Sequence, residues 1–383
     1  MRRRDFIAAT AALLPTRARA KPPRQVLFVC VDGCGPEYIQ ASDVPNLRRM
    51  MRAGTYVEGT DMVPTVTNIN VASLVTGTFP SEHGITANYI YNRASGKNEF
   101  MEAPALLLRP TIFEKARRDG YRTAFVCVKD KLLKMLGQSA DLSCSVENAP
   151  RFLQDKAGPA EAIYSAAINH WALRAVRYLL KDGGYNFVFL ATTDYMMHTH
   201  APNDAASLAH MHELDRLLGA IVDDNPNLEV YLTADHGMNA KPRALDLTRI
   251  LAQAKIPGRA VSLINDRYVA HHASLGGAAY VYFDSPAPMR DAIALLKQTG
   301  GVDHVFPKAQ AAEMFHLMEA RIGDLLVLGA RDTAFGDLQA IEESTTIRSH
   351  GSLHESKVPI LCYGRKVNAA DYQYNFDITR RFL

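Results

Sequence analysis

The chain has 383 residues, of which 48% are hydrophobic and 22% are charged, and its formal net charge at pH 7 is +3. This length and apolar fraction are enough for one large core or two smaller ones, and they argue against a disordered chain. Residues 1–20 hold five arginines and one aspartate, so the remainder carries a formal charge of about −1. A near-neutral chain does not predict the clustered basic face of a nucleic-acid-binding protein.

The first 20 residues have the pattern of a twin-arginine export signal. Three arginines at positions 2–4 precede an apolar stretch that ends at Leu14, and the small-residue sequence Ala-Arg-Ala follows at 18–20. This is the order of charge, apolar stretch and cleavage site in an export signal, and the apolar stretch is too short to span a bilayer. The pattern favours a periplasmic protein that begins near Lys21 and has no stable membrane anchor. The alternative is an ordinary basic terminus on a cytoplasmic protein.

Taken in chain order, the predicted elements alternate between strands and helices. The apolar run at 26–31 predicts a first strand, and residues 43–54 predict a helix that ends at a glycine. An extended segment follows at 56–63, and residues 69–76 predict a helix, with Thr67 on the turn just before it. The next elements are a helix at 111–120, a strand at 121–128, a helix at 159–181, a strand at 186–193, a helix at 207–222 and a strand at 228–234.

Repeated strand–helix units predict an α/β fold, with a mostly parallel central sheet covered by helices on both faces in a three-layer core. Beyond His236 the pattern changes, because residues 268–274 and 278–283 read as strands and 291–298 as a helix without a recognisable motif. A smaller α+β cap is expected there. The predicted division is a catalytic core over 21–237 and 347–383 and a cap over 238–346.

Three carboxylates come directly after predicted strands. Asp32 follows the first strand, Asp194 follows the strand at 186–193, and Asp235 follows the strand at 228–234. The carboxyl ends of parallel strands meet at one edge of an open α/β sheet, where such folds bind their ligands. Three carboxylates at one edge would repel one another unless cations neutralised them, so the pattern favours a metal site.

Histidines near these aspartates provide candidate nitrogen ligands. Asp194 and His198 are separated by three residues, which places both on one face of a helical turn. The glycine after His236 permits a sharp turn through which Asp235 and His236 can both bind. His350 is a candidate for the last nitrogen. Aspartate and histidine together suit zinc, and manganese, iron and cobalt accept the same ligands.

Thr67 is a candidate nucleophile. A threonine hydroxyl reacts poorly in water, but a position beside a divalent cation lowers the pKa of an oxygen by many units. The ordinary alternative for a threonine before a helix is an N-cap. The neighbouring metal motifs favour the nucleophile.

A set of short segments between Val26 and Ile360 is distinctive when taken together. The segments are Val31-Asp-Gly-Cys-Gly-Pro-Glu-Tyr, Thr67-Asn-Ile-Asn with Val75-Thr-Gly, His83-Gly-Ile-Thr-Ala-Asn, Val128-Lys-Asp-Lys, Thr233-Ala-Asp-His-Gly-Met-Asn-Ala-Lys and Asp266-Arg-Tyr-Val-Ala-His-His. In these segments the chain resembles the alkaline phosphatase superfamily, in its nucleotide pyrophosphatase/phosphodiesterase branch. Within that branch it is most similar to the phosphonoacetate hydrolases.

This resemblance implies two zinc ions and a covalent mechanism. The implied ligands are Asp32, Thr67, Asp235 and His236 for one ion, and Asp194, His198 and His350 for the other. In such enzymes the threonine attacks phosphorus, a phosphorylated enzyme forms, and water then releases phosphate. The resemblance also implies that Asn88 holds a phosphoryl oxygen, and a loop asparagine with only local hydrogen bonds is the alternative.

A phosphonoacetate substrate also presents a carboxylate, which a lysine binds well. Lys129 or Lys131 matches one family lysine with this role, and a solvated strand end is the alternative. The family's second lysine should lie between the two Asp-His motifs, but residues 195–234 contain no lysine. Without a replacement, the acetate arm is poorly held and a phosphate ester becomes the expected substrate.

Several other polar residues lie near these motifs. The candidates to replace the second lysine are Arg216, His210 and His212. His200 lies two residues past His198, at a spacing that suits a neighbour better than a ligand. His271 and His272 fall in a predicted strand, where only one of the pair faces a given direction, so we interpret them as structural histidines with satisfied hydrogen bonds.

The sequence therefore predicts a two-zinc hydrolase that cleaves the phosphorus–carbon bond of phosphonoacetate to give acetate and phosphate. The alternative is a phosphodiesterase or nucleotide pyrophosphatase that acts on phosphate esters with the same site, and a zinc-stabilised binding protein without activity is a third interpretation. The expected partner is a small phosphonate or phosphate ester, with no nucleic acid. The sequence leaves open whether the chain is a monomer or a homodimer.

Overall fold

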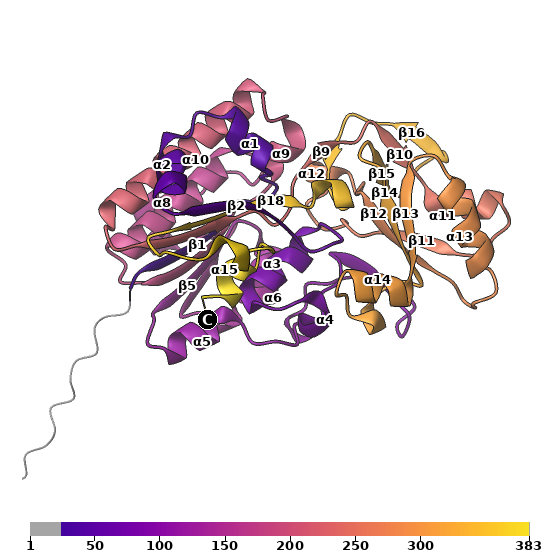
Figure 1. Cartoon of the computed structure of the whole chain (residues 1–383), viewed down its shortest axis with the longest axis horizontal. Helices are drawn as coiled ribbons and strands as arrows, with labels where there is room; N and C mark the ends of the chain where they lie inside the picture. The colour runs from indigo at the N-terminus through magenta and orange to yellow at the C-terminus, as the bar shows by residue number, and fades with distance from the viewer. Residues whose placement is uncertain (1–23, 383) are drawn as a thin grey trace, which may run out of the picture.

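The structure is a computed structural model that describes residues 24–382. The predicted export signal at 1–20 lies outside the described residues. Figure 1 shows two lobes, a larger one around a long sheet and a smaller one that contains the strands β10 to β16. Among residues 24–382, no helix combines the length and the apolar character that a membrane span requires.

The larger lobe is built on a seven-stranded sheet. Its strands are β1 (Val26–Cys30), β2 (Thr55–Thr60), β5 (Thr123–Cys127), β6 (Leu142–Ser145), β7 (Phe187–Ala191), β8 (Glu229–Thr233) and β18 (Lys357–Tyr363). Their order is β2-β18-β8-β1-β7-β5-β6, in which β8 to β6 are parallel and β18 runs antiparallel to both neighbours. The predicted α/β fold with a mostly parallel sheet is confirmed.

Helices cover both faces of this sheet because its strands are apolar on both sides. Alternate side chains of β1 join two separate hydrophobic clusters, with Phe28 in one and Leu27 and Val29 in the other. One cluster includes residues of α3 (Thr67–Thr76), α5 (Ile112–Arg118), α6 (Asp130–Leu136) and α15 (Asp377–Arg380). The other includes residues of α1 (Pro36–Ala41), α2 (Pro45–Ala53), α7 (Arg151–Ala157), α8 (Ala167–Lys181) and α10 (Ala205–Asp224).

The smaller lobe has its own sheets and its own apolar core. A four-stranded antiparallel sheet of order β11-β12-β14-β13 and a three-stranded sheet of order β15-β10-β16 form it. The strands are β10 (Arg243–Leu245), β11 (Arg259–Ser262), β12 (Ala278–Tyr282), β13 (Val302–Pro307), β14 (Leu325–Gly329), β15 (Thr333–Phe335) and β16 (Glu342–Ser344), and the helices are α11 (Leu247–Gln253), α13 (Met289–Gln298) and α14 (Lys308–Met314). All lie inside the segment 238–346, whose exact limits stay a prediction.

Several short elements complete the structure. They are α4 (Pro80–His83), the hairpin of β3 (Tyr89–Asn92) and β4 (Lys97–Phe100), α9 (Tyr195–Thr199), α12 (Val269–His272), and the pair formed by β9 (Asn239–Ala240) and β17 (Arg348–Ser349). Figure 1 places α12 at the side of the smaller lobe that faces α9.

Two predicted elements differ from the structure. Residues 268–274 were expected to form a strand, but they contain the short helix α12. The Asp266 carboxylate accepts the backbone N–H of Tyr268 at 2.7 Å, a local turn that starts this helix. The helix expected at 159–181 begins only at Ala167, because Trp171 donates a side-chain hydrogen bond to the carbonyl of Gly158 and the preceding segment folds back along the helix.

Candidate active site

The predicted metal ligands all lie at the carboxyl edge of the central sheet. Asp32 follows β1, Asp194 precedes the first turn of α9 behind β7, and Asp235 follows β8. Every member of the set is at most 5% exposed: Asp32, Thr67, Asp194, His198, Asp235, His236 and His350. Charged and polar groups buried to this degree need partners of opposite charge or hydrogen bonds.

The first cluster surrounds the Nε2 atom of His236. Oδ1 of Asp32 lies 3.4 Å from it, Oδ2 of Asp235 lies 3.5 Å from it, and the Thr67 hydroxyl lies 3.4 Å from it. The same two carboxylate oxygens have no hydrogen-bond partner within residues 24–382. Buried carboxylate oxygens without a protein partner, beside a histidine nitrogen, are donor atoms that suit a metal cation.

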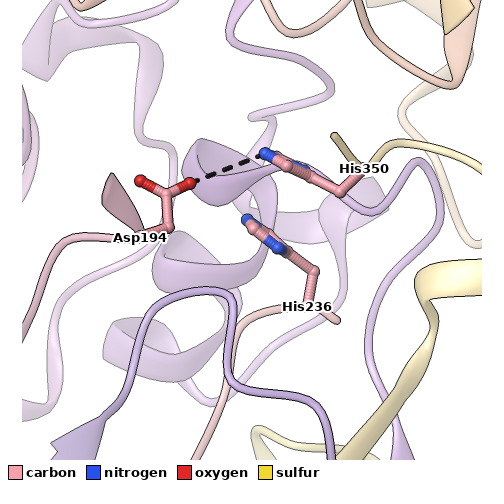
Figure 2. Close-up of side chains that lie close together, drawn as sticks. All are labelled: Asp194, His236 and His350. Atoms are coloured by element: carbon pink, nitrogen blue, oxygen red, sulfur yellow. Dashed lines mark ion pairs between the residues drawn. The ribbon is translucent and has the colours of Figure 1, made fainter. Parts of the chain in front are cut away.

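The second cluster surrounds Oδ2 of Asp194. The Nε2 atom of His198 lies 3.0 Å away and that of His350 lies 3.7 Å away. Figure 2 shows the imidazoles of His236 and His350 one above the other beside this carboxylate, with ring centroids 3.5 Å apart. Ligand atoms of Asp194, His236 and His350 all lie within 4.8 Å of one another. The two clusters are therefore adjacent and meet at His236.

The three histidines of these clusters are oriented in the same way. In each ring, Nδ1 faces a backbone carbonyl, so it carries the proton and Nε2 keeps a free lone pair for a cation. The Nδ1-to-oxygen distances are 2.7 Å for His198 and Arg348, 3.0 Å for His236 and Gly237, and 2.6 Å for His350 and Thr65. Burial and the neighbouring His236 and His198 hold the pKa of His350 well below its usual value, which keeps this ring neutral.

Lys129 bridges the two clusters. Its Nζ lies 2.7 Å from Oδ1 of Asp194 and 3.2 Å from Oδ2 of Asp32. Burial raises the pKa of the Asp32 carboxyl well above its usual range, and the charges of Asp194 and Asp235 raise it further. Burial acts on Asp194 in the same direction, but the Lys129 ammonium holds its pKa well below the usual range. One lysine thus neutralises part of a three-aspartate cluster, and the remaining negative charge favours metal cations.

Thr67 is the first residue of α3 and is not its N-cap. The N-cap position belongs to Val66, and the structure shows no side-chain cap hydrogen bond there. The threonine hydroxyl is therefore not used to cap the N-terminus of this helix. Asn88 has tertiary partners on both sides of its amide, because its Oδ1 accepts the Asn68 N–H at 3.0 Å and its Nδ2 donates to the Ile264 carbonyl at 3.1 Å. One of its two N–H donors is left for a ligand.

Lys131, the other predicted substrate lysine, is buried against the smaller lobe. Its Nζ lies 2.5 Å from Oδ2 of Asp266, whose Oδ1 accepts a bond from Nε2 of His272 at 3.0 Å. Burial raises the pKa of Asp266, but the Lys131 ammonium and His272 reverse the shift and hold it well below its usual range. Sequence reasoning quoted the motif that contains Asp266 without giving this residue a role.

The candidates to replace the missing lysine do not face the metal clusters. Arg216 is exposed and pairs with Glu213 on the same helix at 2.7 Å. His210 bonds to His170 of α8 at 3.0 Å, and the exposed His212 faces the Asp43 carbonyl. The partners of all three lie on helices and loops outside the clusters.

Sequence reasoning missed His271 as a site residue. Its Nδ1 lies 3.6 Å from Oδ1 of Asp194, and its ring lies parallel to that of His198, with centroids 5.8 Å apart. Neither ring nitrogen has a hydrogen-bond partner among the described residues, so the expectation of a satisfied structural histidine is wrong for this residue. Burial, with the nearby Lys129 ammonium, lowers its pKa to about 3. Its only sequence signal was its place in the segment 266–272.

The fold and the site together define the class. A mostly parallel sheet that carries adjacent aspartate–histidine clusters and a threonine hydroxyl at its carboxyl edge is that of an alkaline phosphatase-like hydrolase. The chain belongs to the type I phosphodiesterase / nucleotide pyrophosphatase family, whose sequence model matches residues 26–353.

Solved structures agree with this assignment. Phosphonoacetate hydrolase from Sinorhizobium meliloti 1021, solved with phosphonoacetate and with phosphonoformate, is 30% identical, with a TM-score of 0.86 over 94% of this chain and 95% of that one. Human ectonucleotide pyrophosphatase/phosphodiesterase 5 is 16% identical, with a TM-score of 0.70 over 94% of each chain, and shares the fold.

Similarity to curated proteins is more local. Venom phosphodiesterase of Macrovipera lebetinus is 29% identical over 102 residues, which are 26% of this chain and 12% of that protein. Bis(5'-adenosyl)-triphosphatase enpp4 of Mus musculus is 35% identical over 75 residues, 19% of this chain and 16% of that protein. The chain thus matches less than a fifth of the length of these two relatives.

Proposed function

We propose that this protein is a two-zinc hydrolase that uses Thr67 to cleave phosphonoacetate into acetate and phosphate. The observation that carries the proposal is the pair of adjacent clusters that meet at His236, with the Thr67 hydroxyl 3.4 Å from the same ring. Similarity to the Sinorhizobium meliloti enzyme over nearly the whole chain supports the substrate.

The side chains of the two clusters fit a pair of zinc ions. Unpaired carboxylate oxygens and Nε2 atoms with free lone pairs are a zinc donor set. Asp32, Thr67, Asp235 and His236 would hold one ion, and Asp194, His198 and His350 would hold the other. When bound, the ions supply positive charge that neutralises the aspartates and lowers the pKa of an oxygen nucleophile.

The chain's own residues then divide the work of the reaction. The Thr67 oxygen forms a bond to phosphorus while the phosphorus–carbon bond breaks. The electron pair of the broken bond leaves with the acetate carbon, which takes up a proton. Asn88 offers its remaining N–H to a phosphoryl oxygen. Water later breaks the bond between phosphorus and the threonine oxygen, which releases phosphate and restores the hydroxyl.

Lys129 is placed to stabilise the leaving acetate. Its ammonium group has three N–H donors, and the two carboxylates of Asp32 and Asp194 use two of them. The third donor is available to the substrate carboxylate, on which negative charge develops as the phosphorus–carbon bond breaks. Lys131 is less available, because Asp266 neutralises it.

A phosphodiesterase remains the second candidate, and the pairing of Lys131 with Asp266 is the observation that favours it. A site with few free cations binds the carboxylate of phosphonoacetate weakly. A phosphodiester has no such second anionic group and does not need that cation. Export to the periplasm is a separate prediction that rests on the sequence of residues 1–20.

The first test compares two substrates on zinc-loaded protein. Phosphate release from phosphonoacetate and nitrophenol release from bis(nitrophenyl) phosphate are measured under the same conditions. We expect faster turnover of phosphonoacetate, and a preference for the diester would assign the chain to ester hydrolysis.

A variant of the nucleophile tests the mechanism. Thr67→Ala is expected to lower turnover by at least about a thousandfold while zinc content stays near two ions per chain. Thr76→Ala, which changes another threonine of α3, is the matched control and should keep wild-type turnover. Loss of zinc together with activity in Thr67→Ala would count against the role as nucleophile.

A further inference from the structure

His271 and His272 are neighbours in α12 with opposite hydrogen-bonding states. His272 is satisfied on both ring nitrogens, because Nε2 bonds to Asp266 at 3.0 Å and Nδ1 accepts the Ser274 N–H at 2.9 Å. His271 is equally buried, at 5% exposure, yet neither of its ring nitrogens has a partner among the described residues. Buried polar groups in native proteins are almost always paired, so an unpaired imidazole indicates a partner outside the chain.

The neighbours of His271 show where a ligand bound to its ring would lie. Its Nδ1 lies 3.6 Å from Oδ1 of Asp194, the oxygen that also binds the Lys129 ammonium at 2.7 Å. The other oxygen of Asp194 faces His198 and His350. His271 therefore shares the Asp194 oxygen Oδ1 with Lys129, while its ring stacks beside that of His198.

Aromatic rings from three segments fix the imidazole in this position. Tyr164 meets it edge-on with centroids 5.2 Å apart, Tyr195 of α9 lies at 5.7 Å, and Tyr268 stacks on it at 5.9 Å. The Tyr268 hydroxyl is in turn anchored, because it accepts the Asp130 N–H at 3.0 Å. A ring held on several sides keeps its nitrogens in place before a ligand arrives, as a binding residue requires.

We propose that His271 is a substrate-binding residue that donates a hydrogen bond to the carboxylate of the substrate, next to Lys129. The inference rests on the proposed function. A carboxylate has two oxygens, and the site offers two unused donors side by side, the third N–H of Lys129 and an N–H of His271. The smaller lobe thereby contributes a specificity-determining side chain to a site whose metal ligands come mainly from the larger lobe.

Binding to unreactive protein tests this inference directly. Zinc-loaded Thr67→Ala protein, with and without the added change His271→Phe, is titrated in a calorimeter with phosphonoacetate and with methylphosphonate, which has no carboxylate. Phenylalanine keeps an aromatic ring among the tyrosines and removes both nitrogens. We expect affinity for phosphonoacetate to fall about tenfold or more and affinity for methylphosphonate to change less than about twofold.

Two further variants and the zinc content separate binding from structure. His271→Gln retains an N–H donor and should recover part of the phosphonoacetate affinity. His170→Phe, a change of a half-buried histidine on α8, is the control and should alter neither affinity. Equal losses for both ligands, or loss of zinc in His271→Phe, would overturn the proposal and make the ring a support of the metal centre.

The proposed function and this inference fail in different ways. If wild-type protein does not release phosphate from phosphonoacetate, the proposed function is wrong, whereas a carboxylate preference that depends on His271 would still uphold the inference. If wild-type protein turns over phosphonoacetate and His271→Phe keeps the full preference over methylphosphonate, only the inference is wrong. If Thr67→Ala loses zinc, the same ratio of affinities can be measured on wild-type and His271→Phe enzymes. Phosphonoacetate and methylphosphonate are then compared as competitive inhibitors of bis(nitrophenyl) phosphate hydrolysis.

Discussion

The two halves of the active site balance their charges in different ways. The two candidate metal clusters gather three aspartates and three histidines, with Lys129 as the shared cation and two carboxylate oxygens unpaired among the described residues. The cap junction, by which we mean Lys131, Asp266 and His272, pairs its own charges completely. One half is thus built to be completed by cations, and the other folds without them. The contrast teaches that metal loading and closure of the cap junction are separable properties of this site.

Metal removal should produce the largest effect and should act on the clusters alone. Dialysis against a chelator is expected to abolish turnover and to lower the thermal midpoint, because binding at a thousand times the dissociation constant contributes about 4 kcal/mol to stability. Melting curves and phosphate release before chelation, after it and after zinc addition measure both effects. Undiminished turnover in the metal-free protein would show that the clusters do not need cations.

Breaking the ion pair of the cap junction should be the next largest effect. Lys131→Met leaves the Asp266 carboxylate buried without its cation, which is expected to cost about 3 kcal/mol of unfolding free energy. Denaturant titration measures this cost, and zinc content should stay at the wild-type level. The double change Lys131→Met with Asp266→Asn should cost less than the sum of the single changes, and simple additivity would show that the two side chains act independently.

The pH dependence of the same pair sharpens the comparison. Although burial raises the pKa of Asp266, the Lys131 ammonium and His272 hold it below its ordinary value. A carboxyl with a lowered pKa in the folded state contributes stability that is fully present above its unfolded pKa of about 3.9 and is lost as pH falls below it. The stability difference between wild type and Asp266→Asn should therefore be constant above about pH 5 and shrink at lower pH, in zinc-free samples as well.

The smallest effect is expected on α10, outside both halves of the site. Arg216 is exposed and pairs only with Glu213 among the described residues. Arg216→Ala should change unfolding free energy by less than about 0.5 kcal/mol and leave KM for phosphonoacetate unchanged. A rise in KM without a change in stability would indicate that Arg216 binds the substrate.

The central sheet and the meeting of three aspartates at its edge could be predicted from sequence, because each aspartate directly follows an apolar run that forms a buried strand. Asp32, Asp194 and Asp235 follow β1, β7 and β8, which are neighbours in the sheet. Parallel packing then brings their side chains to one edge without further information. The start of α8 was misplaced, because the contacts that hold the preceding segment beside Trp171 are not visible in a periodic pattern.

The cap junction could not be predicted in the same way. Helix α12 has four residues, too few for a helical period to appear, and the turn at Asp266 that starts it depends on a side chain that also contacts Lys131 and His272. His271 has no hydrogen-bond partner among the described residues because its neighbour His272 bonds to the Asp266 carboxylate. Such competition between adjacent histidines is decided by tertiary contacts, which local propensity does not encode.

The bond between His198 and the Arg348 carbonyl joins positions 150 residues apart, across the whole of the smaller lobe. Arg348 also donates from its side chain to the Met197 carbonyl at 2.9 Å, so the returning chain contacts two consecutive residues of α9. The second cluster therefore forms only when one very long loop closes, and the entropic cost of this closure must be met before His350 reaches Asp194. Zinc occupancy of that cluster would therefore report that the chain has been synthesised and folded past residue 350, and shorter fragments could offer at most the first cluster.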